Sequence, residues 1–408
     1  MFIAVLSWHN IIYKADILPM FLTDEVPNVQ SAVSFFENGS YQNTSYGLIY
    51  SSGIAVTWPS AVGWFLGKRM LASRIGCAFF SWVIAMILGF CFLRNVGYSK
   101  TVSLLSSVSL WAFTITSPFA LPYWFGFMYN LGELNSILLI GMGLLFITKN
   151  PFLSVFVFGV SVWHGKYIYF PLVIFILLGD LLAQKLSVRP LVIKIGGYVG
   201  IFLLPLLVWL GWLSFRFDMA TMEQWLASQL GFLDQYSEIH GPQSPIRISA
   251  SVLLERLKSP ELEWAGYSMG TKIKNLLFSF GPIGFSLVSF IAVKAKKLHA
   301  TSKELWVSLM ASAVICFYSV WYFFINQYMW QRYFQPALYI GIGLFIYWGS
   351  KWERKYAKYL QPVFCAAVIL LLTVQVMKEV KHPLFQPGPS YARLCTDLYG
   401  PSCVPEDE

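Results

Sequence analysis

The stretch IGGYVGIFLLPLLVWLGWL (195–213) contains no charged residue and decides the class of fold. A helix needs roughly 20 mostly apolar residues to cross the hydrocarbon core of a bilayer. This stretch meets that requirement, because its polar content is limited to glycine and single aromatic residues. It therefore predicts a transmembrane helix.

The rest of the chain has the same character. Hydrophobic types make up 57% of the 408 residues and charged types only 12%, and the mean hydropathy is +0.59. A soluble domain carries about 25% charged residues, so these values are typical of membrane proteins. The net charge of +9 comes from short Lys and Arg clusters between apolar runs, not from one basic face. This pattern excludes nucleic acid as a partner.

Ten further apolar runs predict ten further spans. The predicted spans lie near 1–20, 74–93, 101–117, 134–148, 151–164, 167–183, 195–213, 273–293, 305–325, 334–349 and 359–377. The first run is the weakest, because Lys14 and Asp16 follow a short apolar stretch. Either its charged end reaches the interface or the true start lies upstream. The prediction is an all-α polytopic membrane protein with about 11 transmembrane helices.

The basic clusters give the orientation. Those within 185–194, 294–303 and 351–358 are separated by even numbers of spans, so they share one side, which the positive-inside rule makes cytoplasmic. The apolar run 54–66 would invert this order if it crossed, so we predict a re-entrant or interfacial helix there. The N-terminus is then inside and the C-terminus outside.

This topology gives a single transmembrane domain over 1–408 with three long external segments. They are the first external loop 22–73 with its interfacial helix, the large external loop 214–272 and the C-terminal tail 378–408. An amphipathic helix is predicted near 219–233, since Met222, Trp225, Leu226, Leu230 and Leu233 share one face. The external side is therefore expected to carry the chemistry.

Charged side chains recur at the outer ends of the predicted spans. They stand in the sequences Asp24-Glu25, Gly132-Glu133, His164-Gly165-Lys166 and Gln331-Arg332. Each has an ordinary alternative: an acid at a helix start, a snorkelling Lys or an Arg anchored among aromatic residues. Together they could line one external cavity, in which cations hold an anionic lipid head group and a carboxylate acts as general base.

The order of these features resembles the GT-C superfamily of membrane glycosyltransferases, which use lipid-phosphate-linked sugars. The matching pieces are Asp24-Glu25 after a span, 53–59 with the helix that follows, Arg74, the turn LRNVGYSK (93–100), Ser117-Pro118, Gly132-Glu133, Lys166 and Arg332-Tyr333-Phe334. The resemblance covers most of the chain as a topology, and the acid pair is its most specific motif. No WWDxG sequence is present, so the oligosaccharyltransferase branch does not fit.

The resemblance implies a role for each candidate residue. Asp24 would be the catalytic base, although Asp16 could replace it if the first helix ends early. Lys166 and Arg332 would bind the donor phosphate. Supporting roles in the positioning of the acceptor or of a metal would fall to Glu25, Glu133, His164, Gln331 and Arg74. No cofactor is certain, and a divalent metal is possible.

The expected reaction is an inverting transfer from a polyprenyl-phosphate sugar to a hydroxyl of a glycan or lipid acceptor. The small size resembles bacterial inner-membrane enzymes that modify O-antigen, lipopolysaccharide or other surface glycans on the external, periplasmic face. Membrane lipids are the other expected partners. Two alternatives stay open: an O-antigen polymerase or ligase, and a non-enzymatic transporter or flippase of lipid-linked sugars. A transporter would be expected to carry charges deep within its spans, and here they are nearly absent.

Overall fold

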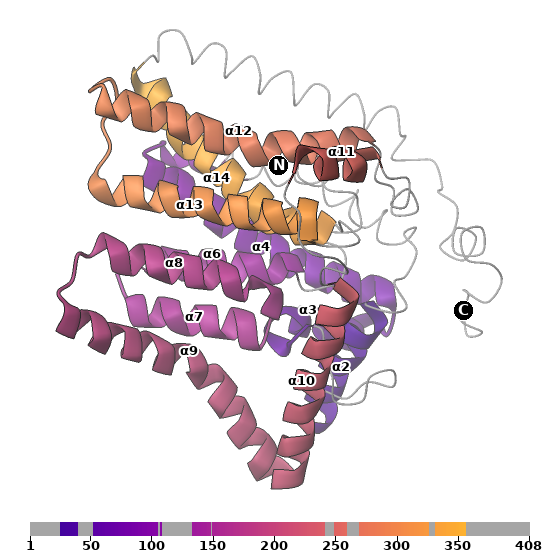
Figure 1. Ribbon diagram of the computed structural model, residues 1–408. Helices are drawn as coiled ribbons and strands as arrows, with labels where there is room; N and C mark the ends of the chain where they lie inside the picture. Colours follow the sequence, from indigo (N-terminus) through magenta and orange to yellow (C-terminus); the bar gives the residue numbers. More distant parts are fainter. Residues whose placement is uncertain are drawn as a thin grey trace. The chain divides into compact units, whose positions relative to one another are not determined.

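The computed structural model describes residues 25–39, 52–104, 107, 133–147, 149–240, 249–258, 269–325 and 331–355. The chain divides into two compact units, which are described separately. Unit 1 comprises 1–166, 202–228 and 365–408, and unit 2 comprises 167–201 and 229–364. Every regular element among the described residues is a helix (Figure 1). Whether the two units form one domain, as the sequence predicts, stays a prediction.

The helices follow one another with short connections. Those of unit 1 are α2 (Glu25–Asn38), α3 (Ile54–Gly67), α4 (Met70–Val96), α6 (Glu133–Phe146) and α7 (Pro151–Trp163). Two helices contribute to both units, α9 (Val188–Arg216) and α10 (Met219–His240). Those of unit 2 are η2 (Tyr167–Tyr169), α8 (Phe170–Ala183), α11 (Ala250–Lys258), α12 (Met269–Lys294), α13 (Ser302–Val320), the π-helical turn η4 (Trp321–Ile325) and α14 (Gln331–Lys355). Helices α12, α13 and α14 pack side by side (Figure 1).

The all-α polytopic class is confirmed. Helices occur at each predicted span that lies within the described residues, namely 74–93, 134–148, 151–164, 167–183, 195–213, 273–293, 305–325 and 334–349. The predicted spans 1–20 and 359–377 lie outside those residues, and only the start of 101–117 lies inside them. By length and composition, Leu71–Asn95, Val188–Arg216 and Glu304–Ile325 can cross a membrane, and the other apolar helices are shorter. The count of eleven and the orientation stay predictions.

The predicted helix at 54–66 exists as α3, which turns directly into α4. The two helices pack antiparallel at small residues. A Cβ on Gly63 would lie 2.1 Å from the carbonyl oxygen of Ala72, and one on Gly76 would lie 2.3 Å from that of Pro59. Only glycine permits this approach of two backbones. Helix α3 is 14 residues long, which is short for a span, but its interfacial placement stays a prediction.

Helix α2 was missed, because the sequence analysis treated the residues before 54 as loop. Pro27 lies in its first turn, where a proline suits a helix. Asn28, Val29 and Ala32 follow at helical spacing, and all three are buried. The acid pair therefore lies at the start of a helix that packs on α3.

The amphipathic helix predicted near 219–233 is confirmed as part of α10, which continues to His240. Its apolar residues differ in burial, however. Trp225 is only 2% exposed, whereas Leu226 is 38% and Leu230 60% exposed. The helix is therefore attached to unit 1 through one large buried side chain and leaves other apolar side chains uncovered.

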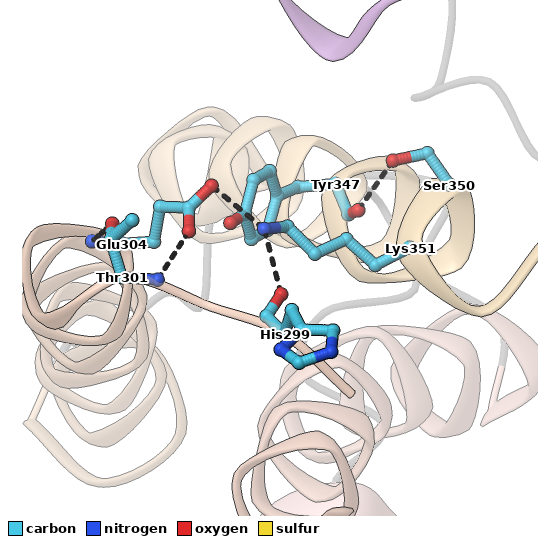
Figure 2. Close-up of polar contacts among 6 residues, drawn as sticks. All are labelled: His299, Thr301, Glu304, Tyr347, Ser350 and Lys351. Atoms are coloured by element: carbon cyan, nitrogen blue, oxygen red, sulfur yellow. Dashed lines mark hydrogen bonds and ion pairs between the residues drawn. The ribbon is translucent and has the colours of Figure 1, made fainter. Parts of the chain in front are cut away.

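A polar cluster ties the start of α13 to the end of α14 (Figure 2). Thr301 and Glu304 form a capping box, in which each side chain accepts a hydrogen bond from the other residue's backbone N–H. Lys351 donates to Glu304 Oε1 at 2.8 Å and to the carbonyl oxygen of His299 at 3.1 Å. One carboxylate thus satisfies a helix start and a cation from the neighbouring helix.

Replacing Glu304 with alanine is expected to destabilise the protein by about 1–2 kcal/mol, because a helix cap and a partly exposed ion pair are lost together. The measurement is thermal unfolding in detergent. Glu223→Ala provides the control, since Glu223 is exposed in α10. Equal melting temperatures for the two variants would contradict the assigned role of Glu304.

Candidate active site

The predicted turn His164-Gly165-Lys166 is fixed by backbone hydrogen bonds to the start of α3. The N–H of Gly53 donates to the carbonyl of Gly165 at 3.0 Å, and that of Ala55 donates to the carbonyl of His164 at 2.9 Å. The N–H of Lys166 donates back to the carbonyl of Ser161 at 3.0 Å. The first amides of α3 thus obtain acceptors that the helix itself cannot supply. The turn holds the backbone of Lys166 in one place.

Two glycines make this contact possible. A Cβ on Gly53 would lie 2.4 Å from the carbonyl carbon and oxygen of His164. A Cβ on Gly165 would lie 2.0 Å from the carbonyl oxygen of Ser161 and 2.6 Å from Oγ of Ser136. Both contacts involve backbone atoms, which cannot move aside as a flexible side chain can. The turn therefore requires glycine at both positions.

Replacing Gly53 with alanine is expected to destabilise unit 1 by more than about 2 kcal/mol, because the added methyl group forces α3 away from the turn. Thermal unfolding and detergent-solubilised yield measure the effect. Gly211→Ala is the matched control, because a Cβ there meets nothing within 4 Å. In a helix that change should be neutral or slightly stabilising. A Gly53→Ala protein as stable as the control would contradict the described turn.

His164 connects three helices of unit 1. Its Nε2 lies 3.0 Å from the carbonyl oxygen of Pro205, so this nitrogen carries the proton and donates. The ring packs edge-on against Trp209 at 5.9 Å, and Trp209 packs against Trp225 at 6.1 Å. The residue predicted as a supporting group thus joins α7 to α9 and, through two tryptophans, to α10.

Asn135 is a polar junction that the sequence analysis did not identify. Its Nδ2 donates to the carbonyl of Val56 at 3.0 Å and approaches Cys77 Sγ at 3.4 Å. Its Oδ1 accepts a hydrogen bond from Ser81. Asn135 therefore fixes the first turn of α6, where Glu133 lies, to α3 and α4. A polar residue two positions after Glu133 in an apolar run was the available signal.

Two predicted cations of unit 1 are buried. Arg74 is 2% exposed in α4 and Lys166 is 8% exposed beside the turn. A buried cation is costly unless partners stabilise it, and both residues have interactions within the structure. The snorkelling alternative for Lys166 is therefore wrong, because its side chain lies within the protein. Buried cations of this kind suit an anionic ligand.

The other candidates lie at helix starts. Glu25 opens α2, Glu133 opens α6, and Gln331 and Arg332 open α14; their backbones are described but their side chains are not. Asp24 lies outside the described residues. Unit 1 contains the candidates up to Lys166, and unit 2 contains Gln331 and Arg332. One shared cavity therefore stays a prediction.

A metal site is likewise untested. Within the described part of the chain, no group of three or more His, Cys, Asp or Glu side chains lies close enough to hold a metal ion. The acids that the sequence analysis associated with a metal have side chains outside that part. A divalent metal therefore stays a prediction, and no step of the reaction is assigned to one.

These features define a polytopic helical membrane protein with buried cations near the ends of its helices. Comparison with solved structures places the fold with ArnT, a glycosyltransferase of the GT-C family. ArnT from Cupriavidus metallidurans in the apo state superposes with a TM-score of 0.52 at 13% identity, and the same protein bound to undecaprenyl phosphate with 0.53 at 12%. The predicted GT-C resemblance is confirmed for the fold.

The shared region is extensive but does not include all of ArnT. It covers 89% of this chain and 63% and 62% of the two ArnT chains. No protein-family model and no curated protein sequence matches the chain. The likeness therefore concerns the arrangement of helices, and activity has to be argued from the residues.

Proposed function

We propose that this protein is a membrane glycosyltransferase that uses a polyprenyl-phosphate-linked sugar. The observation that carries the proposal is the fold shared with ArnT, including the form bound to undecaprenyl phosphate. The buried cations Arg74 and Lys166 of unit 1 add support. A desolvated Lys or Arg forms strong charge-assisted hydrogen bonds with phosphate oxygens.

In the proposed reaction, Lys166 and Arg332 hold the phosphate of the donor. Asp24 accepts the proton of the acceptor hydroxyl, and the oxygen attacks the anomeric carbon from the face opposite the phosphate. The C–O bond to the phosphate breaks, polyprenyl phosphate leaves with the electron pair, and the configuration inverts. Glu25 and Glu133 support the acceptor, with Arg74, His164 and Gln331 around them. Holding both reactants in line lowers the barrier by several kcal/mol.

The backbone geometry of the turn is consistent with this assignment of Lys166. Its position is fixed by the hydrogen bonds of Gly53, Ala55 and Ser161 described above. A cation that binds a leaving group has to stay in place while charge develops on the phosphate. A rigid turn provides that position without reorganisation during the reaction.

Asp180 gives a reason to prefer an enzyme over a transporter. This acid lies inside an apolar helix and would be a candidate for a transport pathway. Its Oδ2 instead accepts hydrogen bonds from Tyr198 at 2.8 Å and Gln184 at 2.5 Å, and it lies 3.8 Å from Lys194 Nζ. These partners belong to the same end of α8 and α9. Asp180 is thus accounted for as a local structural contact.

The acceptor and its location complete the proposal. We infer a glycan or lipid hydroxyl, presented on the periplasmic face of a bacterial inner membrane, with O-antigen or another surface glycan as the acceptor class. The first experiment measures binding of undecaprenyl phosphate to the purified protein in detergent. Saturable binding, weakened by an excess of a polyprenyl-phosphate sugar, is expected. Absence of binding together with measurable lipid transport would favour a flippase.

A further inference from the structure

Helix α11 of the large external segment places Arg256 against the turn η4. Nη1 of Arg256 donates a hydrogen bond to the carbonyl oxygen of Phe323 at 3.3 Å. Phe323 lies in the π-helical turn that ends α13. The last carbonyl groups of a helix have no donor within the helix, so an external donor can fix their direction. Single π-helical turns are frequent at functional sites.

The same turn packs on the start of α14. The ring of Tyr322 lies 5.1 Å from that of Phe334, and the ring of Phe323 lies 6.2 Å from it. Phe334 is fully buried, and it stands two positions after Arg332 in the first turn of α14. A shift of η4 would therefore move the segment that carries the proposed phosphate ligand. All of these contacts lie within unit 2.

Arg256 is built into this contact and is not a surface charge. Its side chain is half-buried, and the neighbouring Leu257 is 9% exposed and anchors α11. Burial lowers the pKa of Arg256, and the adjacent Glu255 opposes this shift. A guanidinium group still keeps its proton at neutral pH, so the donor is permanent. Lys258, two residues later, is exposed.

We propose that Arg256 is a positioning residue for the donor-phosphate site. It holds the carbonyl of Phe323, and thereby η4, in the arrangement that sets the first turn of α14 and with it Arg332. The inference rests on the proposed function, because Arg332 is a phosphate ligand only there. It assigns a role to the large external segment, in which the sequence analysis identified no functional residue.

The test measures binding of undecaprenyl phosphate to the full-length protein in detergent. Arg256→Ala is expected to weaken binding about tenfold, the effect of losing a hydrogen bond to a charged group. Lys258→Ala removes the same charge from the same helix and should change binding less than about twofold. Arg256→Lys retains a donor to one carbonyl and should remain within about threefold of the wild type.

A double-mutant cycle with Arg332→Ala separates positioning from direct contact. If Arg256 acts through Arg332, its replacement in the Arg332→Ala background should weaken binding less than about twofold further. Multiplication of the two effects would overturn the proposal, because Arg256 would then bind the donor independently. If Arg256→Ala lowers the melting temperature, the same cycle is run with Arg256→Gln, which keeps the side-chain volume and one donor.

The outcomes separate this inference from the proposed function. If the wild type binds no undecaprenyl phosphate, the proposed function fails and the inference fails with it. If the wild type binds and Arg332→Ala weakens binding while Arg256→Ala behaves as Lys258→Ala, the inference alone is overturned. Tenfold weakening, rescue by lysine and loss of the effect in the Arg332→Ala background together support it.

Discussion

Replacing Asp24 with asparagine is expected to reduce sugar transfer by about 10²–10⁴-fold, the usual contribution of a general base. The amide keeps the size of the side chain but cannot accept the proton of the acceptor hydroxyl. Binding of undecaprenyl phosphate should stay within about threefold of the wild type, because that step uses the cations. The assay follows transfer from a polyprenyl-phosphate sugar by the purified variant.

Asp16→Asn is the matched control for this prediction. Both acids stand near the end of the first predicted span, and the sequence leaves Asp16 as the alternative base. Full activity in Asp24→Asn together with an inactive, folded Asp16→Asn protein would move the base to Asp16. Full activity in both would remove this part of the mechanism. Gel filtration and thermal unfolding establish that each variant is folded.

Replacing Lys166 with methionine is expected to weaken binding of undecaprenyl phosphate about a hundredfold. The change removes a buried cation while retaining most of the apolar stem, and a charge-assisted hydrogen bond to phosphate can supply an effect of this size. The backbone of the turn should be unaffected, because its hydrogen bonds come from main-chain groups. Binding is measured by titration in detergent at constant ionic strength.

Lys149→Met is the control for Lys166, since Lys149 is exposed in the turn between α6 and α7. It should bind undecaprenyl phosphate as the wild type does. An unchanged affinity in Lys166→Met would show that the buried cation serves only the packing of unit 1. Loss of binding in both variants would instead indicate a nonspecific contribution of net charge.

The long apolar helices could be predicted from the sequence because their signal is local. Runs such as 195–213 contain enough apolar residues to identify a helix without knowledge of its neighbours. Helix α2 was missed because its periodic pattern is short and lies in a polar segment. Its Pro27 and the spacing of Asn28, Val29 and Ala32 become informative only once the packing partner α3 is known.

The candidate site was predictable in part. The sequence identified the turn His164-Gly165-Lys166, but it could not distinguish a snorkelling lysine from a buried one, because that depends on which helices surround it. The junction at Asn135 and the hydrogen bond from Arg256 to Phe323 join residues far apart in the sequence. Such contacts are set by tertiary packing, which single-residue propensities do not encode.

The central claim is tested most directly by one transfer reaction. Purified protein is incubated with a panel of polyprenyl-phosphate sugars and a candidate glycan or lipid acceptor, and the glycosylated product and free polyprenyl phosphate are quantified. The account predicts stoichiometric release of polyprenyl phosphate and a product with inverted anomeric configuration for at least one donor. No product with any donor, together with movement of the intact donor across reconstituted vesicles, would contradict it.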